Sequence, residues 1–277
     1  MGADFVQIFG PRNHCIYCGE SSVNLTKEHV IPRALFGSIV LLKSSCEDCA
    51  RITGNTIEQP VLSRDLDFFR QAAFAPSRKG KQRGKSVFSH DREIVVFGRD
   101  VPIFLSLHTT NPPAIMTDAP LSQFKYAPSL WSVFIDNSGI LRHSDGFKSV
   151  EVALKLSDRD IFFRMIAKIC YAYFKCYFND SEFSQVLGKI IIGEKSGVCS
   201  RVGNIESAKE ESDFIWRIAF NPIHSYLRRK YLAVWFELFG IFGGPTYVTI
   251  VDEWREEYEI INEIPITVSR CRFVQAR

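Results

Sequence analysis

The chain has 277 residues, of which 46% are hydrophobic and 23% are charged. This balance is typical of globular proteins and excludes a disordered or collagen-like chain. The formal net charge is only +3, and no apolar run approaches the ~20 residues of a membrane-spanning helix. The N-terminal sequence lacks the basic segment and long apolar stretch of a secretory signal peptide. We therefore expect a cytoplasmic protein.

Two C-x-x-C pairs dominate the first 50 residues and predict a metal site. They are Cys15 with Cys18 and Cys46 with Cys49. Four thiolates in a tetrahedral array suit Zn²⁺ and leave no open coordination position, so the zinc is expected to be structural. The alternative is redox-active or simply buried cysteines. It is less favoured because a thioredoxin-like motif needs one pair near a βαβ unit, not two pairs.

The segment between and after the cysteine pairs predicts two strands and a helix. Residues 25–31, LTKEHVI, are expected to form a strand that ends before a proline, and residues 38–42, SIVLL, a return strand. Ser45 is expected to cap a helix over residues 46–58, with acidic residues in its first turn. The helix is expected to stop before Pro60.

This pattern resembles the HNH nuclease family, whose core is the ββα-metal fold. The matching segments are CIYC, then TKEHVIPRALFG, then SSCEDCARITGNTIE. The resemblance covers about residues 12–60 and implies a metal-dependent endonuclease that hydrolyses phosphodiester bonds of DNA, with RNA as the alternative substrate. It also implies Mg²⁺ or Mn²⁺ as catalytic cofactor beside the structural zinc. By analogy alone, such an enzyme would suit defence against foreign DNA.

The resemblance also assigns roles to individual residues. His29 would be the general base and Glu28 a ligand of the catalytic cation. A second ligand is expected from the helix, first from Glu58 and next from Asn55. On a regular strand neighbouring side chains point to opposite faces, so the strand must end or distort for Glu28 and His29 to serve one site. Ala50 stands where many family members have His or Asn. The alternative is therefore a zinc-stabilised nucleic-acid-binding protein with a degenerate, inactive site.

The positive charge of the chain is concentrated directly after the predicted helix. Residues 61–86 contain seven Lys/Arg and two Asp/Glu, and we expect a helix followed by a flexible basic arm over residues 61–90. These basic side chains are predicted to contact nucleic-acid phosphates without base specificity. They are Arg64, Arg70, Arg78, Lys79, Lys81, Arg83 and Lys85.

The remaining residues, 91–277, predict a larger α+β domain with a central helix and antiparallel strands. Residues 158–178 have apolar side chains at helical spacing, and Ser157 or Asp158 could cap this helix. Apolar segments rich in β-branched and aromatic residues flank it and predict strands. No motif in this part indicates its role, which could be recognition, sensing or assembly of a homo-oligomer. The expected organisation is thus a nuclease domain over residues 1–60, the basic arm and this domain.

Overall fold

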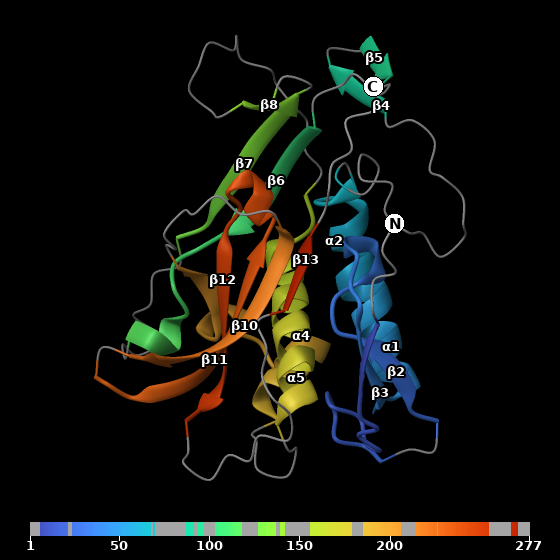
Figure 1. Cartoon of the computed structure of the whole chain (residues 1–277), viewed down its shortest axis with the longest axis vertical. Helices are drawn as coiled ribbons and strands as arrows, with labels where there is room; N and C mark the ends of the chain where they lie inside the picture. The colour runs from blue at the N-terminus through green and yellow to red at the C-terminus, as the bar shows by residue number, and fades with distance from the viewer. Residues whose placement is uncertain are drawn as a thin grey trace.

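A computed structural model describes thirteen stretches of the chain: 6–21, 24–67, 69, 87–90, 93–96, 103–117, 127–136, 139–141, 156–178, 185–205, 214–225, 227–254 and 267–270. The fold is α+β, as predicted. A long helix, α4, lies between the N-terminal elements on one side and an antiparallel sheet on the other (Figure 1). Within the described stretches, no helix combines the length and apolarity needed to cross a membrane.

The N-terminal sheet has three short strands in the order β1-β3-β2. Strand β1 (Gln7–Phe9) runs parallel to β3 (Ile39–Ser45), and β2 (Thr26–His29) runs antiparallel to β3. A 3-10 turn, η1 (Arg33–Leu35), connects β2 to β3. The predicted order of strand, strand and helix is confirmed, although β1 was not predicted.

The helix after β3 is longer than predicted. It consists of α1 (Glu47–Arg51), the π-helical segment η2 (Ile52–Glu58) and α2 (Gln59–Ser63), which follow one another without a break. The prediction that it stops before Pro60 is wrong. The π-helical turn widens the helix just before Pro60, which relieves the clash of the proline ring with the preceding turn.

The N-cap of this helix is Cys46 and not Ser45, which corrects the sequence prediction. The Sγ atom of Cys46 accepts a hydrogen bond from the backbone N–H of Cys49 at 3.5 Å. The Ser45 hydroxyl instead donates to the Cys46 carbonyl at 3.4 Å. A cysteine sulfur thus satisfies the helix donor that a serine oxygen was expected to satisfy.

The C-terminal part is built on a five-stranded antiparallel sheet in the order β13-β10-β11-β12-β9. Its strands are β9 (Val202–Ile205), β10 (Phe214–His224), β11 (Lys230–Leu238), β12 (Thr246–Glu253) and β13 (Thr267–Arg270). The apolar segments that predicted strands in this region correspond to β10, β11 and β12.

Two smaller sheets and several single turns complete the described structure. The antiparallel sheets are β4-β5 and β6-β7-β8. Their strands are β4 (Val87–His90), β5 (Glu93–Val96), β6 (Ile103–Thr109), β7 (Ser129–Asp136) and β8 (Gly139–Leu141). The 3-10 turns are η3 (Ala114–Thr117), η6 (Val198–Ser200) and η7 (Gly240–Phe242).

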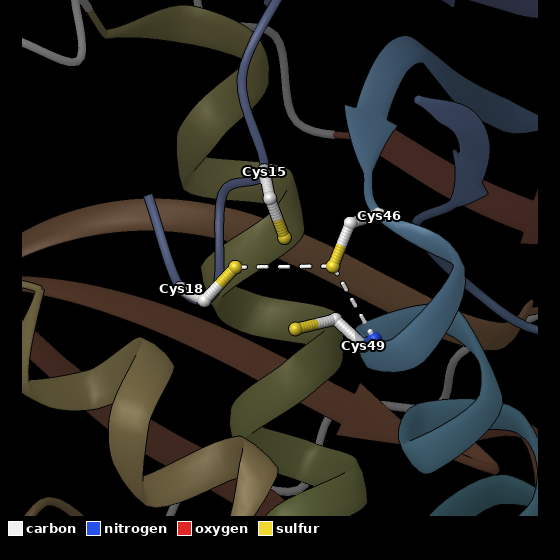
Figure 2. A group of neighbouring side chains, drawn as sticks. All are labelled: Cys15, Cys18, Cys46 and Cys49. Atoms are coloured by element: carbon white, nitrogen blue, oxygen red, sulfur yellow. Dashed lines mark hydrogen bonds between the residues drawn. The ribbon is translucent and has the colours of Figure 1, made fainter. Parts of the chain in front are cut away.

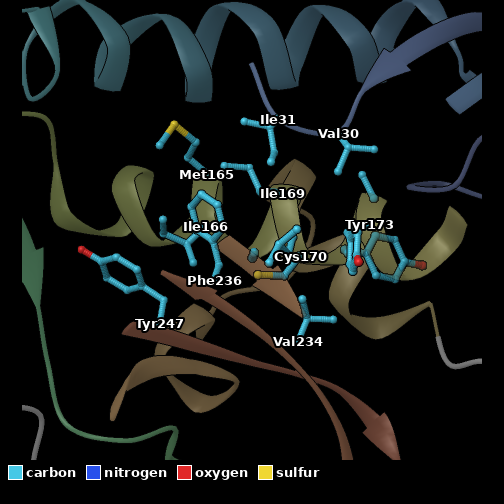
Figure 3. Packing of buried hydrophobic residues seen from close by; sticks show 14 of the residues in the cluster. Val30, Ile31, Met165, Ile166, Ile169, Cys170, Tyr173, Val234, Phe236 and Tyr247 are labelled. Carbon is cyan, nitrogen blue, oxygen red and sulfur yellow. The ribbon is translucent and has the colours of Figure 1, made fainter. Parts of the chain in front are cut away.

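Helix α4 (Arg159–Tyr177) is the predicted central helix. Asp158 caps it, since its carboxylate accepts a hydrogen bond from the N–H of Asp160 at 2.8 Å. Nearly the whole helix is buried from its second turn onward. Figure 3 shows why: Val30 and Ile31 cover one side of α4, and Val234 and Phe236 of the sheet cover the other.

The N-terminal and C-terminal parts share one hydrophobic core. The buried cluster is continuous from Phe9 and Leu35 through α4 to the five-stranded sheet. The ring of Phe9 packs edge-on against that of Tyr177 with centroids 5.0 Å apart. The indole N–H of Trp216 donates to the Leu35 carbonyl at 2.9 Å. The predicted division of the chain into a nuclease domain, a basic arm and a larger domain stays a prediction.

Helix α5 (Val186–Ile192) packs directly on the first cysteine pair, which gives a testable prediction. A Cβ atom at Gly188 would lie 2.6 Å from the Tyr17 carbonyl oxygen, whereas a Cβ at Gly54 would meet nothing within 4 Å. We expect Gly188→Ala to lower the free energy of unfolding by about 1–3 kcal/mol through overpacking. The control Gly54→Ala should leave it unchanged or raise it by up to about 1 kcal/mol. Urea unfolding measures both, and equal effects would contradict this packing.

Candidate functional site

The four cysteines of the two pairs converge on one point. Their Sγ atoms all lie within 4.8 Å of one another, and those of Cys18 and Cys46 are 3.8 Å apart (Figure 2). A tetrahedral zinc with ~2.3 Å bonds to sulfur has S–S edges of about 3.8 Å. Cys15, Cys46 and Cys49 are buried. The predicted four-cysteine cluster is confirmed, and its geometry is that of a structural zinc site.

Local backbone geometry explains how the sulfurs meet. The first pair lies in a turn that Gly19 closes: its N–H donates to the Cys15 carbonyl at 2.8 Å, and its φ is +84°. Glycine adopts this left-handed conformation without steric cost. The second pair lies at the start of α1, with Cys46 as N-cap and Cys49 in the first turn. A helix N-terminus favours thiolates, because its free N–H groups point at them.

The protonation of the cluster also favours a bound cation. The hydrogen bond from Cys49 lowers the pKa of Cys15 to about 4, and the same contact is the main cause that raises the pKa of Cys49. Burial raises the pKa of Cys18 to about 11. Four thiols this close cannot all ionise unless a cation neutralises them, and Zn²⁺ supplies that charge. The donor set therefore fits zinc.

Strand β2 ends where the candidate catalytic residues lie. Glu28 pairs with Leu41 and His29 with Val40, and the register of the ladder shifts between Thr26 and Glu28. Strand β2 ends at His29. Glu28 is buried and His29 is half-buried. The expectation that the strand distorts and ends at this place is confirmed.

A lysine from α4 reaches the end of β2. The Nζ atom of Lys168 lies 2.5 Å from Glu28 Oε1 and 2.7 Å from Glu58 Oε1. It also donates to the carbonyl oxygens of His29 at 2.5 Å and Val30 at 3.3 Å. The two carboxylates predicted as metal ligands thus do converge, and the group on which they converge is an ammonium.

The charges in this cluster are strongly perturbed by burial. Burial raises the pKa of Glu28; the Lys168 ammonium opposes this effect, and the negative charge of Glu58 adds to it. Burial alone would lower the pKa of Lys168, but the two carboxylates outweigh it and raise the pKa overall. One protonated lysine therefore lies between two acidic side chains and compensates one of their two negative charges.

His29 carries a neutral imidazole at neutral pH. Its pKa is lowered, mainly by burial and then by the nearby charges of Lys168, Lys27 and Arg33. Its Nδ1 atom is buried and has no hydrogen-bond partner among the described residues. A half-buried neutral imidazole of lowered pKa can accept a proton at neutral pH, which is the property that a general base needs.

Residues 15–66 match the family model of HNH endonucleases.

The match covers both cysteine pairs, β2, β3 and the helix that follows, and we call residues 15–66 the HNH region. It bears out the resemblance seen in the sequence and indicates a nuclease-type function that acts on nucleic acid. No curated protein and no solved structure gives a significant match to the chain. The family match ends at residue 66, so it assigns no role to the larger part after the HNH region.

The structure brings Glu58 to Glu28 but leaves Asn55 apart. Asn55 is exposed on η2, whereas the Glu58 side chain is 18% exposed and contacts Lys168. At α-helical spacing, Asn55 and Glu58 would share one face of the helix. The π-helical segment advances by a smaller angle per residue, which separates them around the axis. Asn55 as a metal ligand stays a prediction without support from this geometry.

The acid pair of Glu28 and Glu58 does not fit a divalent cation in the observed arrangement. Mg²⁺ binds oxygen atoms at about 2.0–2.1 Å in an octahedral shell that usually includes several waters. Lys168 Nζ fills the position between the two carboxylates and would repel a second cation there. Among the described residues, only the four cysteines form a group of three or more His, Cys, Asp and Glu side chains placed for a metal.

Most of the predicted nucleic-acid contacts fall on residues that the structure does not describe. Arg64 follows the end of α2 and is exposed, as a phosphate contact requires. The other six lie outside the described residues: Arg70, Arg78, Lys79, Lys81, Arg83 and Lys85. Their contact with nucleic acid stays a prediction.

Lys168 was not predicted as a site residue from the sequence. It lies 140 residues after Glu28, so no local motif connects the two. A signal was nevertheless present, because Lys168 interrupts the run MIAKIC in a helix that is apolar on most of its surface. Lysine is almost never fully buried unless it is paired. A lysine in such a helix therefore predicts a carboxylate partner elsewhere in the chain.

Proposed function

We propose that the protein is an endonuclease that hydrolyses phosphodiester bonds of DNA, with His29 as the general base. The observation that carries the proposal is the position of His29 in the HNH region. The half-buried imidazole lies at the end of a strand of the ββα unit, and the four-cysteine site clamps the start of its helix. The zinc site leaves no open position for substrate, so the chemistry belongs to residues outside it.

The proposed reaction is an attack of water on the phosphorus atom. His29 takes a proton from this water as the new P–O bond forms, and the bond to the leaving oxygen breaks. The Mg²⁺ or Mn²⁺ implied by the family resemblance would neutralise charge on the phosphate and the leaving oxygen. No step is assigned to such an ion, because the acid pair does not fit one.

Cleavage assays with defined substrates test this proposal. The purified protein is incubated with supercoiled plasmid DNA and, separately, with a structured RNA, each with Mg²⁺, with Mn²⁺ and with neither. Nicked or linear plasmid supports the proposal, and faster loss of RNA would replace DNA by RNA as the substrate. Intact substrates under all conditions would overturn it.

The lowered pKa of His29 predicts the pH dependence of cleavage. A general base acts in its neutral form, so a lower pKa keeps it active at lower pH. In a plot of kcat/KM against pH, we expect the acid limb to have an apparent pKa below the ordinary histidine value of 6.5. A pH profile of plasmid nicking measures it. An acid limb with an apparent pKa at or above 6.5 would contradict the role of His29, with its lowered pKa, as the general base.

A second function is supported by two departures from a standard nuclease site. Ala50 cannot bind a metal, and Lys168 already forms ion pairs with both members of the acid pair. These features favour a zinc-stabilised protein that binds nucleic acid without cutting it. Binding of labelled DNA in a mobility-shift assay, without cleavage under any of the conditions above, would select this function.

A further inference from the structure

The strongest unexplained feature of the molecule is the buried ammonium of Lys168. The lysine side chain is 0% exposed, and the side chains of Glu28 and Glu58 are 8% and 18% exposed. Four oxygen atoms lie within hydrogen-bond distance of Nζ, from these two carboxylates and from the carbonyls of His29 and Val30. An ammonium has three N–H donors, so these acceptors saturate it.

This arrangement is costly unless the charges compensate one another. A buried ammonium without partners is strongly destabilising, and the same holds for two adjacent buried carboxylates. Here the lysine separates two acids that would otherwise repel each other. The cation and the acid pair are therefore mutually required.

The ammonium also lies where the family resemblance would place a divalent cation. Glu28 and Glu58 were the first two candidates for its ligands, and they do converge on one point. That point lies 2.5 Å and 2.7 Å from their oxygens and is occupied by Lys168 Nζ. A divalent ion at the same point would clash with the ammonium and be repelled by it.

We propose that Lys168 is the resident cation of the Glu28–Glu58 pair and takes the place of a divalent metal ion there. The two ion pairs of Lys168, with Glu28 on β2 and with Glu58 on η2, then hold the end of β2 against η2. The inference deepens the proposed function, because His29 lies at this strand end. Lys168 would occupy the position between the two acids whether or not the protein cuts DNA.

The part of the chain that the family match does not cover contributes Lys168 to this cluster. Lys168 belongs to α4, which lies against the five-stranded sheet and far beyond the HNH region in sequence. The C-terminal part thus supplies a charged group to the HNH region and fixes the backbone beside the candidate base. Its role includes completion of this site.

Binding of Mn²⁺, followed by electron paramagnetic resonance of the free ion, tests the proposal without any assay of activity. In the zinc-loaded wild-type protein, we expect no Mn²⁺ site that Glu28→Gln would remove. Lys168→Met frees the acid pair and is expected to gain one Mn²⁺ site per chain. Lys168→Met combined with Glu58→Gln is expected to lose that site again. The control Lys189→Met changes a half-buried lysine on α5 and should behave as wild type.

Two results would overturn the proposal. The first is Mn²⁺ binding by the wild-type protein that Glu28→Gln abolishes, because the pair would then hold a metal in spite of the lysine. This comparison needs no lysine variant, so it holds even where Lys168→Met does not fold. The second is a folded Lys168→Met variant, with normal zinc content, that binds no Mn²⁺. A wild-type protein that cuts no nucleic acid would contradict the proposed function. The Mn²⁺ binding expected for each variant would be the same in that case.

Discussion

Replacement of His29 with alanine is expected to lower the rate of plasmid cleavage by about 10²–10⁴-fold, the usual contribution of a general base. The imidazole is half-buried at the end of β2, and its lowered pKa keeps it neutral at neutral pH. Alanine removes the proton acceptor but fits the space, and its backbone carbonyl can still accept from Lys168. We therefore expect cleavage to fall with little change in fold.

The control for this prediction is His224→Ala. His224 is an exposed residue at the end of β10 and has no place in the proposed site. Rates are measured under single-turnover conditions for both variants, with zinc content and circular dichroism compared to wild type. A folded His29→Ala variant that cuts at the wild-type rate would remove His29 from the base role.

Replacement of Cys49 with serine is expected to release the zinc and to lower the free energy of unfolding by about 4 kcal/mol or more. Structural zinc contributes apparent binding energies on the order of 10 kcal/mol in small zinc domains. Cys49 is buried, and its sulfur lies within 4.8 Å of the other three. Part of the loss should be offset, because the N-terminal part shares its core with α4.

Cys199→Ser is the matched control, because Cys199 lies in η6 and is only half-buried. Metal content is measured by mass spectrometry and stability by thermal unfolding. The control should keep one zinc per chain and a nearly unchanged Tm. A Cys49→Ser variant that keeps both its zinc and its stability would contradict the four-cysteine site.

The parts of the fold that were predictable are those in which local pattern and tertiary packing agree. The spacing of Cys15, Cys18, Cys46 and Cys49 was sufficient for the metal cluster, because a C-x-x-C turn points both sulfurs at one place. Helix α4 was predictable because it combines a good N-cap, Asp158, with nineteen residues of helix-compatible sequence. In both cases nothing distant in the chain had to be known.

The features that were missed depend on contacts between distant segments or on unusual backbone geometry. The short strand β1 has three residues and forms only because β3 offers an edge beside it. The helix continues through Pro60 because η2 is π-helical, which propensity rules do not foresee. The contact of Lys168 with Glu28 and Glu58 joins α4 to the HNH region, and only the folded chain brings these three residues together.

The most direct test of the nuclease account is a gel assay of supercoiled plasmid with zinc-loaded wild-type protein and His29→Ala side by side. We expect nicked and then linear plasmid from the wild type, and plasmid that stays supercoiled over the same time with the variant. Plasmid that stays supercoiled with both proteins, or is cut equally by both, would contradict it.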